Sequence, residues 1–130
     1  FGAPETASPQ STSDGGGTHD RTITEDTITG TVVLTDRTIG DVVTFDQTGA
    51  SMSSRETDTW SITRGDPLSA RTTSERSWSI RWNADLAVEV RTHSELWCDA
   101  EYFHTSDVIV AFENGEKCFT STRSSNHRRH

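Results

Sequence analysis

The stretch that decides the fold is residues 74–91, SERSWSIRWNADLAVEVR, in which apolar and polar residues alternate in two runs. In Ser77–Trp82 every second residue is Trp or Ile, and in Leu86–Arg91 every second residue is Leu or Val. A period of two over this length is typical of antiparallel strands with one packed face and one wet face. The residues between the runs, Asn83–Asp85, favour a tight hairpin.

The same pattern continues on both sides of this stretch. Thr-rich and β-branched segments predict further strands at 22–25, 29–35, 42–45, 57–63, 102–112 and 117–122. Turn residues separate them at Asp36–Gly40, Thr48–Gly49 and Glu113–Glu116. No window has a helical period, so we predict an all-β protein, an antiparallel and jelly-roll-like β-sandwich. The side chains expected in its core are Trp78, Ile80, Trp82, Leu86, Val88, Val90, Val108, Val110 and Phe112.

Composition divides the chain into three parts. Residues 1–20 are rich in Ser, Thr, Pro and Gly and predict a disordered N-terminal linker. Residues 21–124 are expected to form the β-sandwich domain, and the polar residues 125–130 a frayed C-terminal tail. Only 30% of the residues are apolar, so the core of this domain is expected to be small.

The charge balance limits the kinds of partner. Acidic residues outnumber basic ones by 20 to 12, which gives a net charge of −8. Such a field repels phosphate backbones and anionic lipid, so we expect neither nucleic acid nor a membrane as partner. No stretch resembles a signal peptide or a membrane-spanning helix, which favours a cytoplasmic location.

Motifs for catalysis or cofactor binding are absent from the sequence. The nearest approach to the Gly-x-Ser-x-Gly motif of serine hydrolases is Gly49–Ser53, which ends in Ser. His93, Asp99, Glu101 and His104 lie within twelve positions, but their spacing fits no metal signature. We therefore predict no catalytic residue, no cofactor and no metal in this chain.

The two cysteines, Cys98 and Cys118, leave two interpretations open. They could pair if their strands are neighbours, or they could be thiols that pack as small apolar groups. Nothing marks the chain as secreted, and this favours the thiols.

One tryptophan differs from the others in its predicted position. Alternation through Val88, Val90 and Leu96 places Trp97 on the opposite, polar side, beside His93 and Glu95. We therefore predict a docking or ligand surface at Trp97, His93 and Glu95. A bulge near Cys98 would instead return Trp97 to the core. Because sugars stack on exposed indoles, a free-standing carbohydrate- or ligand-binding module is the alternative function.

Two motifs give the chain a resemblance to a known family. Gly65–Arg71, GDPLSAR, and Cys98–His104, CDAEYFH, resemble motifs near the end of the cocaine esterase/X-prolyl dipeptidyl aminopeptidase group of serine hydrolases. The order of features also resembles that group: Trp60–Ile62, the Asp-Pro-Leu-Ser-Ala turn, a hairpin, and a Gly-centred turn before Cys118. The resemblance covers residues 28–124, whereas the ending Ser124–His130 departs from the family pattern.

The resemblance implies that catalysis and this β-domain belong to different domains of one enzyme. That family combines an α/β-hydrolase domain, which carries a Ser-Asp-His triad, with a helical cap and a C-terminal jelly-roll β-domain. This chain resembles the last part of the β-domain, whose implied role is to pack on the catalytic domain and shape the substrate cleft. None of the triad motifs lies in the matching stretch, so no triad residue is carried over, and His104 belongs to the β-domain's own motif.

Overall fold

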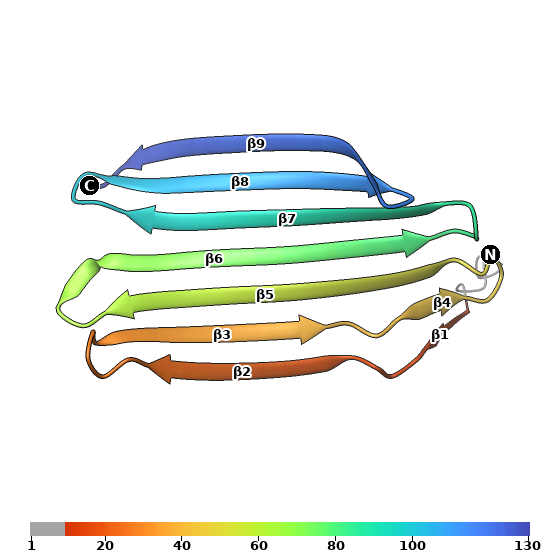
Figure 1. Ribbon diagram of the computed structural model, residues 1–130, viewed down its shortest axis with the longest axis horizontal. Coiled ribbons are helices and arrows are strands. Elements are labelled where there is room, and N and C mark those ends of the chain that lie inside the picture. Colours follow the sequence, from red (N-terminus) through yellow and green to blue (C-terminus); the bar gives the residue numbers. More distant parts are fainter. Residues whose placement is uncertain (1–9) are drawn as a thin grey trace, which may run out of the picture.

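The computed structural model describes residues 10–130; residues 1–9 lie outside the described part of the chain. Its secondary structure consists of strands that follow one another in an antiparallel meander (Figure 1). The strands are β1 (Ser11–Ser13), β2 (Thr18–Glu25), β3 (Thr31–Ile39), β4 (Val43–Phe45), β5 (Ser51–Thr63), β6 (Asp66–Arg81), β7 (Ala87–Cys98), β8 (Tyr102–Glu113) and β9 (Glu116–Arg128).

All nine strands belong to a single antiparallel sheet. The long strands β5 to β9 pair in chain order, while β3 and β4 share the outer edge of β5 and pair with β2 and β1 respectively. The predicted all-β class is confirmed, and the sheet, which is not closed into a barrel, is consistent with a β-sandwich. Within residues 10–130, no helix is long and apolar enough to cross a membrane.

The registers define two faces of the sheet, because residues directly opposite each other on neighbouring strands share a face. One face, which we call the Trp78 face, carries Trp78, its β7 partner Val90 and its β5 partner Ser54. The other, which we call the Trp97 face, carries Trp97 with its β6 partner Arg71 and its β8 partner His104.

The predicted core is wrong in two respects. The β7–β8 register pairs Val108 with His93 and Val110 with Arg91, so these valines and Phe112 lie on the Trp97 face rather than with Trp78. Alternation within one strand shows which of its residues share a face. Which face of the whole sheet that is depends on the register between neighbouring strands. Burial is also lower than expected: within residues 10–130 Ala50 is the one buried apolar residue, and Trp78 is 49% exposed.

Some predicted boundaries also change. Asp36–Ile39 continue β3 instead of forming a turn, because Asp36 is held by ion pairs to β2. Strand β2 begins at Thr18, so the expected linker does not extend to residue 20, and residues 1–9 of it lie outside the described part. The expected frayed tail is instead the end of β9, which pairs with β8 as far as Arg128.

The two predicted hairpin loops are confirmed, and local chemistry explains them. The Asn83 side chain accepts hydrogen bonds from the backbone N–H groups of Asp85 (2.8 Å) and Leu86 (2.9 Å). In the β8–β9 loop Asn114 and Gly115 have φ values of 51° and 82°, the left-handed conformations that a two-residue hairpin requires. These loops fix the registers of the long strands and thereby the composition of each face.

Candidate functional site

The predicted surface at Trp97, His93 and Glu95 lies on one face of β7, as parity predicted. The Trp97 ring stacks on His104, with the ring centroids 5.4 Å apart, and the Arg71 guanidinium lies 5.6 Å from the Trp97 centroid. Arg71 in turn donates a 2.6 Å hydrogen bond to Glu95. No bulge interrupts β7, so Trp97 does not return to the Trp78 face.

His93 sits between two carboxylates on neighbouring strands. Its Nδ1 lies 3.2 Å from Glu75 on β6, and its Nε2 lies 3.0 Å from Glu95 on β7. Because a carboxylate only accepts hydrogen bonds, this geometry suits the imidazolium, which donates from both nitrogens. The bond to Glu95, followed by that carboxylate's charge and the Glu75 contact, accordingly raises the pKa of His93 above its usual value. His93 and then Arg71 lower the pKa of Glu95.

A second histidine, His104 of β8, bonds to the loop between β7 and β8. His104 Nε2 lies 2.7 Å from Asp99, and its Nδ1 lies 2.7 Å from the Asn126 side-chain oxygen on β9. The Asp99 bond raises the pKa of His104, and the same bond, with two backbone N–H donors, lowers the pKa of Asp99 to about 2. The resulting network is polar and exposed, and its titratable groups are already paired with one another.

These pKa directions predict how the stability of the sheet depends on pH. A histidine whose pKa is raised by folding contributes stability below about pH 6.5, and this contribution is lost as the pH rises through the folded-state pKa. We expect the melting temperature of the protein to fall between pH 6 and pH 9, and to fall less in the His93→Gln, His104→Gln double variant. Thermal unfolding followed by circular dichroism at both pH values checks this. The His127→Gln variant is the control, and an equal fall in the double variant would contradict the assignment.

The four residues considered as metal ligands do not converge. Asp99 and His104 lie together, but the register rows of His93 and His104 are four residues apart, about 13 Å along the strands. Among residues 10–130, no three side chains of His, Cys, Asp or Glu are grouped so that they could hold a metal ion.

On the Trp78 face a row of polar residues crosses the sheet from one edge to the other. Its members are in register on seven strands: Arg21, Asp36, Asp58, Ser74, Ser94, Asp107 and Arg123. We call this the polar row. Asp36 and Asp58 face each other across β3 and β5, where two like charges would destabilise the sheet if they were not neutralised.

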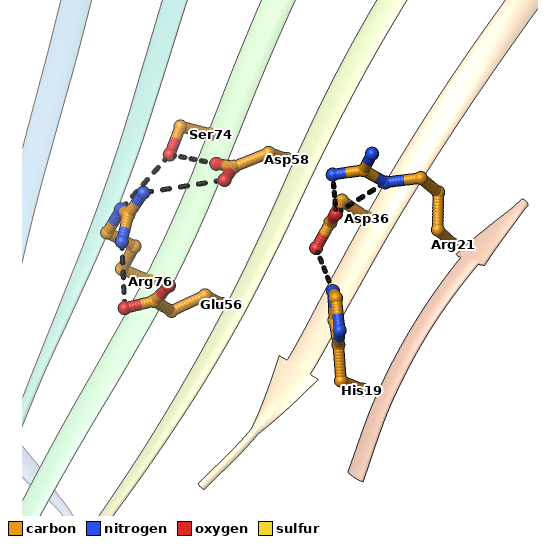
Figure 2. Close-up of polar contacts among 7 residues, drawn as sticks. All are labelled: His19, Arg21, Asp36, Glu56, Asp58, Ser74 and Arg76. Carbon is orange, nitrogen blue, oxygen red and sulfur yellow. Dashed lines mark hydrogen bonds and ion pairs between the residues drawn. The ribbon is translucent and has the colours of Figure 1, made fainter.

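Each of these two carboxylates lies against an arginine, and Arg76 beside Asp58 also pairs with Glu56, as Figure 2 shows. Arg21 lies 2.7 Å and His19 lies 2.9 Å from Asp36, and these contacts, Arg21 first, lower the pKa of Asp36. Asp58 accepts a 2.6 Å hydrogen bond from Ser74 and lies 3.4 Å from Arg76. The charges of this part of the polar row are therefore compensated within the chain.

Large apolar side chains lie on both sides of the polar row and are left exposed. Eight of the exposed large apolar residues on strands belong to the Trp78 face: Ile23, Trp60, Ile62, Trp78, Leu96, Phe103, Ile109 and Phe119. Only two, Ile39 and Tyr102, belong to the Trp97 face. Two apolar regions exposed on one face, on either side of the polar row, are typical of a contact with another protein layer.

Cys98 and Cys118 are both free thiols, and no disulfide joins them. They are not buried, however: Cys98 is half-buried beside Phe103 on the Trp78 face, and Cys118 is exposed at the irregularity between β8 and β9.

Comparisons with protein-family models, with curated proteins and with solved structures found no match to this chain.

The sequence interpretation missed the polar row and the asymmetry between the faces. The sequence holds one indication of the polar row, which is a charged residue two positions from an apolar residue of the same face. This occurs at Arg21, Asp36, Asp58 and Asp107. Finding that the four share one row requires the strand registers, which the sequence does not show.

Proposed function

We propose that this chain is a non-catalytic β-domain that packs on the catalytic domain of an α/β-hydrolase-like serine esterase or X-Pro dipeptidyl peptidase and helps to shape its substrate cleft. The observation that carries the proposal is the exposed apolar surface of the Trp78 face. The motif resemblance at Gly65–Arg71 and Cys98–His104 supports the kind of partner.

The Trp78 face needs a cover that the described residues do not provide. Trp60 and Trp78 are 40% and 49% exposed, and Ile62 is 46% exposed. Full burial of a large apolar side chain contributes about 1.5–3 kcal/mol, so covering the exposed part of each of these residues contributes about half of that. A domain that packs over both apolar regions would therefore stabilise the sheet as well as position it.

The polar row favours a second domain over an ordinary hydrophobic layer as this cover. Charged side chains that enter an apolar interior lose their hydration at a large cost, even when they are paired. Contacts between domains are more polar and retain water, so they accommodate a row such as Arg21, Asp36 and Asp58. Asp36 and Asp58 are paired within the chain and need no counter-charge from the partner.

The sequence-based docking surface has a smaller part in this proposal. Both sides of the Trp97 ring are occupied by neighbours, Arg71 and His104, and this leaves little indole face for a partner or a sugar. The Trp78 face is accordingly assigned to docking.

Replacing Trp97 by Ala is expected to leave the sheet folded but less stable. The variant loses one aromatic stack and one cation–π contact, which together contribute about 1–2 kcal/mol. Thermal unfolding followed by circular dichroism is expected to show a cooperative transition a few degrees below that of the parent chain. An unfolded variant at 25 °C would mean that the Arg71–Trp97–His104 stack, rather than strand pairing, sustains this end of the sheet.

The proposed function is tested by assaying hydrolysis of an acyl ester, p-nitrophenyl acetate, and of an X-Pro p-nitroanilide. The 130-residue chain alone is expected to hydrolyse neither above the buffer rate. The same chain joined to an α/β-hydrolase domain of this family is expected to raise the activity of that domain. Hydrolysis by the isolated chain that a chelator abolishes would instead identify a metal-assisted enzyme and overturn the proposal.

A further inference from the structure

A hollow lies on the Trp97 face of the sheet, opposite the surface assigned to docking. It has a volume of about 690 Å³ and spans strands β5 to β8. Such a volume falls in the range of sites for small molecules, about 300–1,000 Å³.

Its shape follows from the alternation of long and short side chains across the strands. The register row Arg55–Ser77–Arg91 places a serine between two arginines on neighbouring strands. Ser53 and Ser79 form a second pair of short side chains one row away. The serines make a low floor, and the longer side chains form its walls.

The floor consists of hydroxyl groups that are free to bind a ligand. Ser53, Thr57, Ser77 and Ser79 line the hollow, and their side chains make no hydrogen bond to any residue between 10 and 130. Each hydroxyl offers one donor and two acceptors. Val108 and Val110 of β8 give the same hollow an apolar wall.

One cation in the lining has no ion pair, whereas the other charged side chains of the lining are paired. Glu75 is paired with His93 (3.2 Å), Glu89 with Arg91 (2.7 Å), and Arg76 with Glu56 (2.8 Å) and Asp58 on the Trp78 face. Arg55 also lines the hollow, but it forms no ion pair within the described part of the chain. A guanidinium beside free hydroxyls suits a carboxylate, which it can bind with two parallel hydrogen bonds.

We propose that this hollow binds a small polyhydroxylated carboxylate, the chemistry of a sugar acid. Arg55 holds the carboxylate, the hydroxyls of Ser53, Ser77 and Ser79 bind the ligand's hydroxyl groups, and Val108 and Val110 contact its C–H face. The site does not depend on the proposed docking function, since the two use opposite faces of the sheet.

The test is a titration of the isotope-labelled 130-residue chain, followed by amide chemical shifts, with glucuronate, glucose and acetate at constant ionic strength. Glucuronate is expected to shift the amides of residues 53–57 and 75–79 with a Kd of about 1 mM or below. Glucose and acetate, which each lack one of the two recognised groups, are expected to bind about tenfold more weakly.

Two variants locate the site. Arg55→Gln is expected to weaken glucuronate binding about tenfold, whereas Arg123→Gln, on the Trp78 face of β9, is expected to leave it unchanged. Ser77→Val, which fills the floor without removing a charge, provides a second loss of binding should Arg55→Gln not fold. Absence of glucuronate shifts, equal binding of glucose or acetate, or full binding by Arg55→Gln would each overturn the proposal.

Discussion

Replacing Val88 by Asp is expected to unfold the protein or to lower its free energy of unfolding by about 2–4 kcal/mol. Val88 is half-buried on the Trp78 face, between Ile80 of β6 and Glu113 of β8. The substitution removes apolar contact with Ile80 and sets a second carboxylate opposite Glu113. Because so little of this sheet is buried, a loss of this size is a large share of its total stability.

Urea unfolding followed by tryptophan fluorescence measures this effect. The matched control is Val88→Thr, which keeps the β-branched shape and strand propensity without adding a charge, and which is expected to cost less than half as much. If Val88→Asp unfolds at the same urea concentration as the parent chain, apolar contact on the Trp78 face contributes little to the free energy of unfolding, and this prediction is wrong.

The Trp60→Ser, Trp78→Ser double variant is expected to weaken docking on the proposed hydrolase domain by about a thousandfold. The two indoles lie on either side of the polar row, one in each apolar region of the Trp78 face. Large aromatic residues near the centre of an interface contribute about 2 kcal/mol or more each when they are fully covered. Both side chains are exposed in the isolated chain, so their replacement affects docking more than folding.

Isothermal titration calorimetry with a separately expressed α/β-hydrolase domain of the proposed family measures the affinity and checks this prediction. The control is Trp97→Ser on the opposite face, with an expected change below about threefold. A larger effect at Trp97 than at Trp60 and Trp78 would restore the sequence-based docking surface at Trp97, His93 and Glu95.

The sequence predicted what is local in this fold. Alternation around Trp78 and Val88 predicted long antiparallel strands, and the loops at Asn83–Asp85 and Glu113–Glu116 were correctly placed because their side chains or positive φ angles act within a few residues. Parity within β7 was also sufficient to separate Trp97 from Val88 and Val90. Each of these inferences uses the geometry of a single strand or turn.

What depends on pairing between strands could not be read from the sequence. Val108 and Val110 were assigned to the same face as Trp78, but the β7–β8 register places them opposite His93 and Arg91. Shifting the register by one residue exchanges the two faces of a strand, and alternation alone does not define that register. The polar row and the hollow at Arg55 are likewise products of register.

We expect the Trp78 face to be covered when the chain is bound to an α/β-hydrolase domain of the proposed kind. Hydroxyl-radical footprinting of the four tryptophans tests this proposal by comparing the chain joined to such a domain with the 130-residue chain alone. We expect Trp60 and Trp78 to be oxidised at less than about a third of their rate in the chain, with Trp97 unchanged. Equal oxidation of Trp60 and Trp78 in both samples would contradict the account.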